Sequence, residues 1–212
     1  MSILNEISEL VIKGDIANVK AKVSEAMEQK VDASSILNDG LMPGINEIGD
    51  RFAKGQVFVP NVLLSAKAMN AGVELIQPLL ASAGDTTIGT AVIGTVKGDL
   101  HDIGKNLVGL MMKSVNMKVI DLGANVPGEK FIEAIKEYNP QIVGLSALLT
   151  TTMNEQAHII EQFKEAGVRD KVKVMIGGAP VTQMWADKIG ADAFTTDAAE
   201  ASRWAKQYVT KG

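Results

Sequence analysis

Residues 90–115 read TAVIGTVKGDLHDIGKNLVGLMMKSV and contain one complete strand–loop–helix unit. The β-rich apolar run 90–96 predicts a buried strand, and the apolar spacing of 103–115 predicts an amphipathic helix. Further units follow toward the C-terminus, with strands expected at 118–122, 142–148, 172–176 and 193–195, and helices at 128–137, 154–165, 181–189 and 198–208. Successive βα units predict an α/β fold, a parallel sheet with helices on both faces.

The expected sheet is flavodoxin- or Rossmann-like, with five strands in the order 2-1-3-4-5, because right-handed crossovers leave few other topologies. In such sheets ligands bind beyond the carboxyl ends of the strands, at the point where the strand order reverses. That point lies between the first and third strands. We therefore expect a functional site in segments 96–105 and 146–152.

The N-terminal residues 1–86 have helical periodicity throughout and predict a four-helix bundle, which precedes the α/β domain at 87–212. Asp32 is expected to cap the third helix of the bundle. Pro43 and Gly44 lie inside that helix, and they predict a break or a kink there.

The composition narrows the possible chemistry. The 212-residue chain has no cysteine and two histidines, which excludes disulfides and thiolate metal sites and leaves too few ligands for a multi-histidine site. A net charge of −4 without any basic run argues against nucleic-acid binding. The N-terminus is not signal-like, and the longest apolar stretch, about 142–149, is too short to span a bilayer. We expect a cytoplasmic protein with no membrane partner.

The loop after the first strand contains His101, with Asp99 two residues before it. A carboxylate can accept the Nδ1 proton of an imidazole, which fixes the tautomer and leaves Nε2 free as a base or a metal ligand. Gly104 is expected to let the chain turn tightly into the next helix. The loop is not a phosphate loop, because Asn106 stands where a magnesium-binding hydroxyl is needed. On these residues alone, a loop histidine satisfied by hydrogen bonds is an equal alternative.

The spacing Asp99-x-His101-x-x-Gly104 resembles the D-x-H-x-x-G signature of cobalamin-binding domains. A helical module before such a domain is the layout of the methyl-transferring corrinoid proteins. These include methionine synthase and the small corrinoid proteins of methanol, methylamine and aryl-methyl-ether methyltransferase systems, whose length this chain matches best. The resemblance extends over essentially the whole chain.

Two further motifs strengthen the resemblance. Ser146-x-Leu148 follows the third strand, as the S-x-L of the family does, and Gly177-Gly178 follows the fourth, as its G-G does. The resemblance implies that these glycines leave room for the nucleotide tail of the cofactor, where a side chain would not fit. Ser146 and Thr150 are implied to contact the corrin or the tail.

The resemblance also assigns the metal ligand. His101 would replace the cofactor's own base below the cobalt, in the base-off, His-on mode, with Asp99 as its hydrogen-bond partner. Thr152 aligns with the hydroxyl that completes a His–Asp–hydroxyl relay, a position where methionine synthase has serine. The implied cofactor contacts of the α/β domain are Gly98, Asp99, His101, Asp102, Gly104, Ser146, Leu148, Thr150, Thr152, Gly177 and Gly178.

The helical module is implied to cap the upper face of the cobalt. Phe52 and Val59 match positions that shield the methyl group in methionine synthase, and ordinary core packing is the alternative role for both. His158, the second histidine, is expected to be a solvated helix residue.

The implied function is that of a methyl carrier without catalytic activity of its own. The cobalt would accept a methyl group from a methylated one-carbon substrate through a substrate-specific methyltransferase. It would pass that group to a second methyltransferase acting on tetrahydrofolate or a thiol, and a reductive activator is a further expected partner. The alternatives are a cobalamin-dependent sensor or regulator and the cobalamin subunit of a carbon-skeleton mutase. The sequence leaves the methyl donor open among methanol, methylamines, betaines and methoxylated aromatics.

Overall fold

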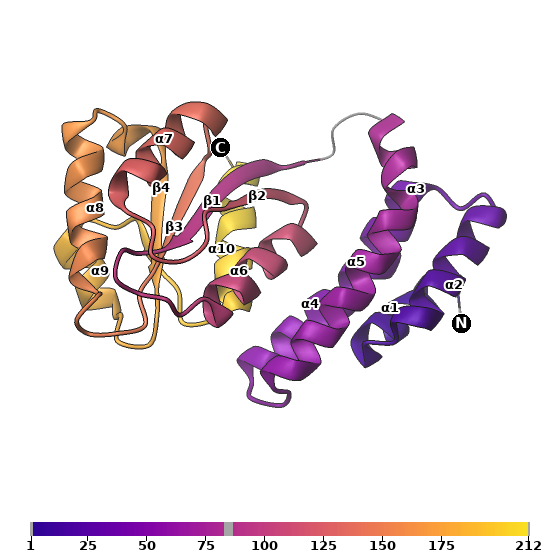
Figure 1. Ribbon diagram of the computed structural model, residues 1–212. Helices are drawn as coiled ribbons and strands as arrows, with labels where there is room; N and C mark the ends of the chain where they lie inside the picture. Colours follow the sequence, from indigo (N-terminus) through magenta and orange to yellow (C-terminus); the bar gives the residue numbers. More distant parts are fainter. Residues whose placement is uncertain (1, 83–86, 212) are drawn as a thin grey trace. The chain divides into compact units, whose positions relative to one another are not determined.

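The computed structural model describes residues 2–82 and 87–211. Its contacts divide the chain into two units, Met1–Thr86 and Thr87–Gly212. Each unit has its own core, and Figure 1 shows that one consists of helices and the other of a sheet with helices.

The second unit is built on a five-stranded parallel sheet with the order β2-β1-β3-β4-β5. Its strands are β1 (Gly89–Thr95), β2 (Met117–Asp121), β3 (Ile142–Ser146), β4 (Lys173–Gly177) and β5 (Ala193–Phe194). The predicted order is confirmed. The four strands predicted after the first lie within two residues of their expected bounds, and β3 ends at Ser146 rather than at Leu148.

Helices cover both faces of this sheet. They are α6 (Ile103–Ser114), α7 (Gly128–Tyr138), α8 (Asn154–Glu165), α9 (Gln183–Ile189) and α10 (Ala198–Lys211), with a short 3₁₀ turn at Arg169–Lys171. Helix α6 packs beside α10, and α7, α8 and α9 form the other layer. Strands β1, β3 and β4 are largely buried, because apolar side chains on both of their faces meet a helix layer. Gly94 in β1 has no side chain where the ring of Phe131 from α7 packs, since a Cβ there would lie 2.6 Å from that ring.

The strand register brings three strand ends together. Thr95 at the end of β1 pairs with Ser146 of β3, and Ser146 pairs with Gly177 of β4. The strand order reverses between β1 and β3, so the switch point at which ligands bind in such sheets lies directly beside these three residues. The loops that follow them carry the D-x-H-x-x-G, S-x-L and G-G motifs.

The first unit consists of helices connected by short loops. They are α1 (Ile3–Lys13), α2 (Ile16–Glu28), α3 (Ala33–Ser35), a π-helical turn (Ile36–Leu41), α4 (Met42–Ala53) and α5 (Val59–Ser82). The side chain of Asp32 accepts a hydrogen bond from the backbone N–H of Ser35, 3.1 Å away, which confirms the predicted cap. The chain is helical without interruption from α3 through the π-helical turn to α4, and this stretch corresponds to the third predicted helix.

Of the predicted alternatives, a break or a kink at Pro43 and Gly44, the break is wrong, because the chain remains helical through both. The π-helical turn lies directly before them, and Pro43 falls in the first turn of α4, where proline is tolerated. Gly44 serves close packing instead. A Cβ there would lie 2.6 Å from the carbonyl oxygen of Ser8, so glycine lets α4 approach α1.

In the part of the chain that the structure describes, no helix has both the length and the apolar character needed to cross a lipid bilayer.

Candidate functional site

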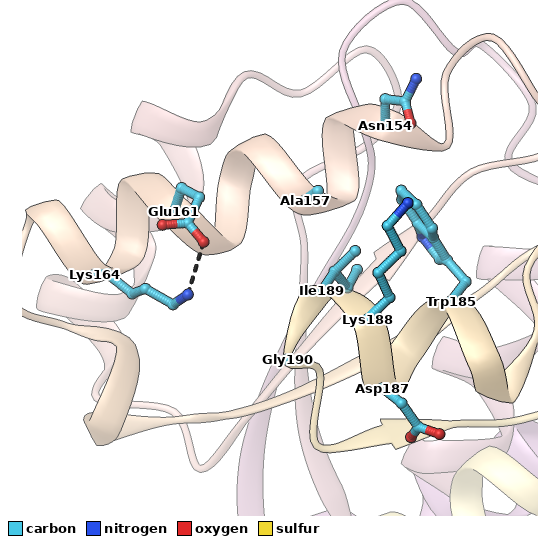
Figure 2. A pocket seen from close by; sticks show the side chains of 9 residues that line it. All are labelled: Asn154, Ala157, Glu161, Lys164, Trp185, Asp187, Lys188, Ile189 and Gly190. Carbon is cyan, nitrogen blue, oxygen red and sulfur yellow. Dashed lines mark hydrogen bonds and ion pairs between the residues drawn. The ribbon is translucent and has the colours of Figure 1, made fainter.

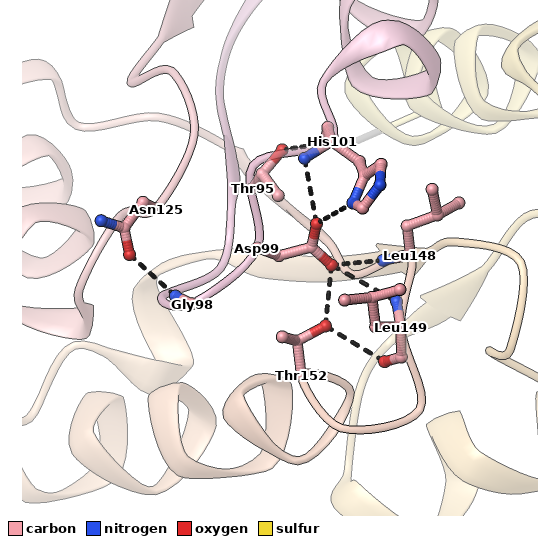
Figure 3. Close-up of polar contacts among 8 residues, drawn as sticks. All are labelled: Thr95, Gly98, Asp99, His101, Asn125, Leu148, Leu149 and Thr152. Atoms are coloured by element: carbon pink, nitrogen blue, oxygen red, sulfur yellow. Dashed lines mark hydrogen bonds and ion pairs between the residues drawn. The ribbon is translucent and has the colours of Figure 1, made fainter.

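The candidate site lies in the loop that connects β1 to α6. The loop leaves the sheet after Thr95 and turns at Gly98, whose φ of +83° is in the left-handed region that favours glycine. The backbone N–H of Asp99 then donates to the carbonyl of Val96 at 3.2 Å. This turn directs the side chain of Asp99 back toward the start of the loop after β3 (Figure 3).

Asp99 is completely buried, and both of its carboxylate oxygens are used. Oδ1 accepts the backbone N–H of His101 at 3.0 Å and faces the ring Nδ1 of the same residue at 2.7 Å. Oδ2 accepts the hydroxyl of Thr152 at 2.7 Å, together with the backbone N–H groups of Leu148 at 2.7 Å and Leu149 at 3.3 Å. One carboxylate thus connects the first switch-point loop to the second.

These contacts set the ionisation state of the site. Burial raises the pKa of Asp99, but the hydrogen bonds from the His101 backbone, the Thr152 hydroxyl, the His101 ring and the Leu148 backbone outweigh burial and hold the pKa well below its usual range. The carboxylate is therefore ionised at neutral pH and acts as an acceptor in all of these contacts.

His101 is left with one free ring nitrogen. Because the ionised carboxylate accepts, Nδ1 carries the proton and Nε2 presents a lone pair. Among the described residues Nε2 has no hydrogen-bond partner, and about half of the side chain is exposed. This arrangement of carboxylate, imidazole and free nitrogen is the usual one for a metal-ligating histidine. The described residues contain no cluster of three or more His, Asp or Glu side chains that could hold a metal ion without other ligands.

Exposed apolar side chains lie close in sequence to His101 and in the loop after β3. Leu100 is 76% exposed and Ile103 is 71% exposed, while Leu148 and Leu149 are both 41% exposed. Four exposed apolar residues in these two segments, 100–103 and 148–149, are typical of a surface that a large apolar ligand covers.

Gly104 contributes space rather than a turn, so the expected reason for glycine there is wrong. It lies in the first turn of α6 and is not among the glycines with positive φ, and a Cβ would have no heavy atom within 4 Å. The turn is made by Gly98 instead.

The two glycines after β4 differ from each other. A Cβ on Gly178, where φ is +131°, would overlap the carbonyl of Ala147, so the backbone itself requires glycine there. A Cβ on Gly177 would meet only the carbonyl oxygen of Thr195 at 3.7 Å, an ordinary contact. The protein's own packing is therefore sufficient to explain Gly178, and for Gly177 the expected explanation, room for a ligand, stays a prediction.

The other expected contacts lie around the same edge. Ser146 is half-buried at the end of β3, and Thr150 is exposed in the loop that follows. Asp102 precedes α6, where its carbonyl accepts the N–H of Asn106 at 2.7 Å. Phe52 and Val59 belong to the other unit, near the end of α4 and at the start of α5, and both are half-buried. Their proposed cap role stays a prediction.

Two residues of the site were not predicted from the sequence. Thr95 is buried, and its hydroxyl donates to the carbonyl of His101 at 3.0 Å. The side chain of Asn125, in the loop after β2, accepts the N–H of Gly98 at 2.8 Å. The available signals were a hydroxyl at the end of an otherwise apolar strand and an asparagine, which tolerates left-handed backbone, in a loop beside glycine.

A surface groove lies elsewhere, between α8 and α9 (Figure 2). It encloses ≈ 420 Å³ beside the ring of Trp185, which the ammonium group of Lys188 approaches to 5.5 Å. The groove shares no lining residue with the Asp99 cluster. The indole N–H of Trp185 donates to Gln156 at 3.1 Å, and the amide of Gln156 donates to the carbonyls of Leu145 and Gly177. Trp185, which lines the groove, therefore supports the ends of β3 and β4 through Gln156.

Comparisons with known proteins agree with this geometry. Two family models, each described as a B12 binding domain, match residues 89–203 and 3–77. The chain is 46% identical to the dimethylamine corrinoid protein of Methanosarcina barkeri, over 97% of this chain and 96% of that one. It is 44% identical to the trimethylamine corrinoid protein of the same organism, over 94% and 93%. A solved structure, the methanol:cobalamin methyltransferase complex MtaBC from Methanosarcina barkeri, superposes with a TM-score of 0.85 at 29% identity, covering 99% of this chain and 80% of that chain.

Proposed function

Since the chain belongs to the cobalamin-binding corrinoid proteins of methyltransferase systems, we propose that it holds the cobalt of its cofactor through His101. As a member of that family it binds cobalamin and acts as a methyl carrier together with methyltransferase partners. The His-on mode, the identity of the methyl donor and acceptor, and the roles of individual residues are the proposals that follow.

The donor set of the site fits a corrinoid. A corrinoid would bring most of the ligands of its cobalt with it, so a single protein nitrogen would be sufficient, and Nε2 of His101 is available for that purpose. The exposed leucines and isoleucine around it, the open space at Gly104 and the ordinary contact at Gly177 suit a broad apolar ring with an attached tail. When it is bound, cobalamin supplies the cobalt that carries the methyl group.

The chain's own residues orient and hold this ligand. Asp99 keeps the Nδ1 proton on His101 and so keeps the lone pair on Nε2, while Thr152 and the Leu148 and Leu149 amides keep the carboxylate in place. We expect Asp102, Ser146, Leu148 and Thr150 to line the cofactor and Gly177 to admit its tail. The single observation that carries the proposal is the buried, ionised carboxylate that holds an exposed imidazole by one nitrogen only.

The methyl donor that we propose is a methylated amine, dimethylamine or trimethylamine. The support is the 44% and 46% identity to the corrinoid proteins named for those amines, against 29% to the structure of the methanol system. A second methyltransferase would transfer the methyl group to a thiol or to tetrahydrofolate, and a reductive activator would restore the cobalt after oxidation. The sensor and mutase alternatives gain no support from relatives of this kind.

We also propose that the helical unit caps the methyl-bearing face, with Phe52 and Val59 as apolar cover. Both side chains are only half-buried within the described residues, so neither belongs to the fully buried core. Exclusion of water from a reactive carbon is what such a cover contributes.

The proposed function is tested by loading the full chain with hydroxocobalamin, reducing it and adding the amine-specific partner methyltransferase. We expect the visible spectrum to report methylation with dimethylamine or trimethylamine and none with methanol. The proposal fails if the chain retains no corrinoid, or if methanol with its own methyltransferase is the donor that works.

Two glycine variants test whether Gly177 leaves room for the tail of the cofactor. Gly177→Ala adds a methyl group without a clash in the protein, so we expect unchanged stability and weaker corrinoid binding. Gly178→Ala collides with Ala147, so we expect it to destabilise the protein before any cofactor is added. Unchanged corrinoid affinity in Gly177→Ala would rule out the proposed slot at that residue.

A further inference from the structure

Asn125 makes two hydrogen bonds to the backbone of the loop that carries His101, one through its own backbone and one through its side chain. Its backbone N–H donates to the carbonyl of Asp99 at 2.9 Å, and its side-chain Oδ1 accepts the N–H of Gly98 at 2.8 Å. The residue has a φ of +56°, a left-handed conformation that asparagine tolerates better than most residues. A single residue from the loop after β2 therefore fixes the peptide unit on each side of the Gly98–Asp99 bond.

Asp99 is thus held by two different loops, one of which contacts its main chain and the other its carboxylate. Leu148, Leu149 and Thr152 hold the side chain of Asp99 from the loop after β3, whereas Asn125 holds its main chain from the loop after β2. The two strands lie on opposite sides of β1 in the sheet. Gly98 has no side chain of its own to restrict the turn, so the loop depends there on hydrogen bonds: those of Asn125 and the one from the Asp99 N–H to the carbonyl of Val96 at 3.2 Å.

The loop that carries Asn125 is itself fastened. Nζ of the buried Lys105 contacts Asp121 at the end of β2 at 2.6 Å, and Asp121 accepts the N–H of Gly123 at 2.8 Å. The carbonyl of Gly123 accepts the N–H of Thr95 at 2.9 Å. These contacts fix residues 121 and 123, so they hold the loop that carries Asn125 in place.

We propose that Asn125 is a positioning residue that keeps the Asp99 carboxylate, and through it the imidazole of His101, in the orientation that ligates cobalt. This inference rests on the proposed role of His101. Without the side chain of Asn125, Asp99 still accepts from Thr152 and from the amides, and its carbonyl still accepts the N–H of residue 125. The N–H of Gly98 loses its acceptor, however, so the turn at Gly98 is held less firmly. The imidazole then spends less time aligned with the metal, while the cofactor stays bound through its other contacts.

The design separates side chain from backbone. Asn125→Gly keeps the left-handed backbone and its N–H but removes Oδ1, whereas Asn125→Asp keeps an acceptor in the same place. Asn139→Gly is the matched control. Asn139 also has a left-handed backbone (φ +44°), and it caps the C-terminus of α7. Asn125→Ser provides a second loss-of-contact variant with a shorter side chain.

The readout is electron paramagnetic resonance of the full chain loaded with cob(II)alamin, with ¹⁵N in the histidine rings. A histidine ligand splits the cobalt lines into doublets, and added imidazole of natural isotope content converts them to triplets as it displaces the histidine. Loss of one hydrogen bond of ordinary strength predicts that the half-converting imidazole concentration falls about three- to tenfold in Asn125→Gly and Asn125→Ser. We expect Asn125→Asp and Asn139→Gly to remain within about twofold of the unmodified chain, as expected where the contact is kept or absent.

Ligation by His101 and positioning by Asn125 are contradicted by different results. No doublet in the unmodified chain would overturn the proposed ligation by His101. The role of Asn125 would be overturned if the unmodified chain shows the doublet but its half-converting imidazole concentration is unchanged in Asn125→Gly. The same holds if that concentration falls equally in Asn125→Gly and Asn139→Gly. Either result would leave ligation by His101 standing.

Discussion

The two histidines of the chain each face a carboxylate, yet only one of the pairs is built as a site. His101 meets Asp99 at 2.7 Å, and His158 meets Glu155 at 3.1 Å in the first turn of α8. The side chain of Asp99 has no exposure, whereas that of Glu155 is 33% exposed and that of His158 is 68% exposed. Proximity of a carboxylate and an imidazole is thus common to both.

The difference lies in what holds the carboxylate. Asp99 is bound by residues 49 to 53 positions away, from a loop at the end of another strand. Glu155 is three residues from its histidine on the same helix surface, and such exposed pairs contribute little. A histidine is positioned for ligation when its partner is immobilised from across the sheet, and the following variants test that contrast.

The largest contrast is expected between His101→Ala and His158→Ala. Removal of a direct ligand exceeds the tenfold to hundredfold losses seen for outer partners, so we expect cobalamin affinity to fall by more than about 100-fold in His101→Ala. His158→Ala is expected to match the unmodified chain. Equilibrium titration with hydroxocobalamin measures both, and equal losses in the two variants would remove the distinction.

Asp99→Asn and Glu155→Gln compare the carboxylates. An amide in place of the Asp99 carboxylate turns an NH₂ group toward buried donors, which predicts a loss of about 2–4 kcal/mol in the free energy of unfolding. We expect cobalamin affinity to fall about 10- to 100-fold in the same variant. Glu155→Gln is expected to change stability by less than about 0.5 kcal/mol. Urea denaturation of both proteins checks the stability values, and a similar loss at Glu155 would contradict the account.

The stability that Asp99 provides should depend on pH in one direction. Its pKa is lowered on folding, so near pH 4 the unfolded chain binds more protons than the folded chain and stability rises with pH. The contribution is complete above about pH 5 and is lost as the pH falls through the ordinary carboxyl pKa of about 3.9 and below. The stability gap between the unmodified chain and Asp99→Asn should therefore be constant from about pH 5 to 7 and should narrow below about pH 4. A gap that widens in acid would show that the sign is wrong.

The smallest effect is expected from Thr152→Val. The buried hydroxyl donates to Asp99, and its loss predicts a cost of about 1–2 kcal/mol in urea denaturation. Thr152→Ser keeps the donor and should recover most of that cost, while Thr150→Val, at an exposed position, serves as the control. If valine at 152 is as stable as serine, the hydroxyl does not support the carboxylate.

Much of this arrangement could be predicted from the sequence. Periodicity predicts the βα units, because buried parallel strands and amphipathic helices have different apolar spacing. The strand order follows from the handedness of the crossovers, which leaves few topologies for five such units. The resemblance of the loop to D-x-H-x-x-G pointed to Asp99, His101 and Thr152, and the structure brings these three together.

The remaining features depend on register and on distant backbone, which no local pattern encodes. The amides of Leu148 and Leu149 reach Asp99 only because β3 ends at Ser146, two residues earlier than predicted. The hydrogen bond between the Gly98 N–H and the side chain of Asn125 joins residues 27 positions apart. The π-helical turn before Pro43 likewise depends on how the helices of the first unit pack, where the sequence alone predicted a break or a kink.

The most direct test of the central claim is the electron paramagnetic resonance spectrum of the full chain with ¹⁵N-labelled histidine and bound cob(II)alamin. We predict doublet splitting from a histidine nitrogen in the unmodified chain and in His158→Ala, and loss of that doublet in His101→Ala. A triplet from the cofactor's own ¹⁴N base in the unmodified chain, or a doublet that survives in His101→Ala, would contradict ligation by His101.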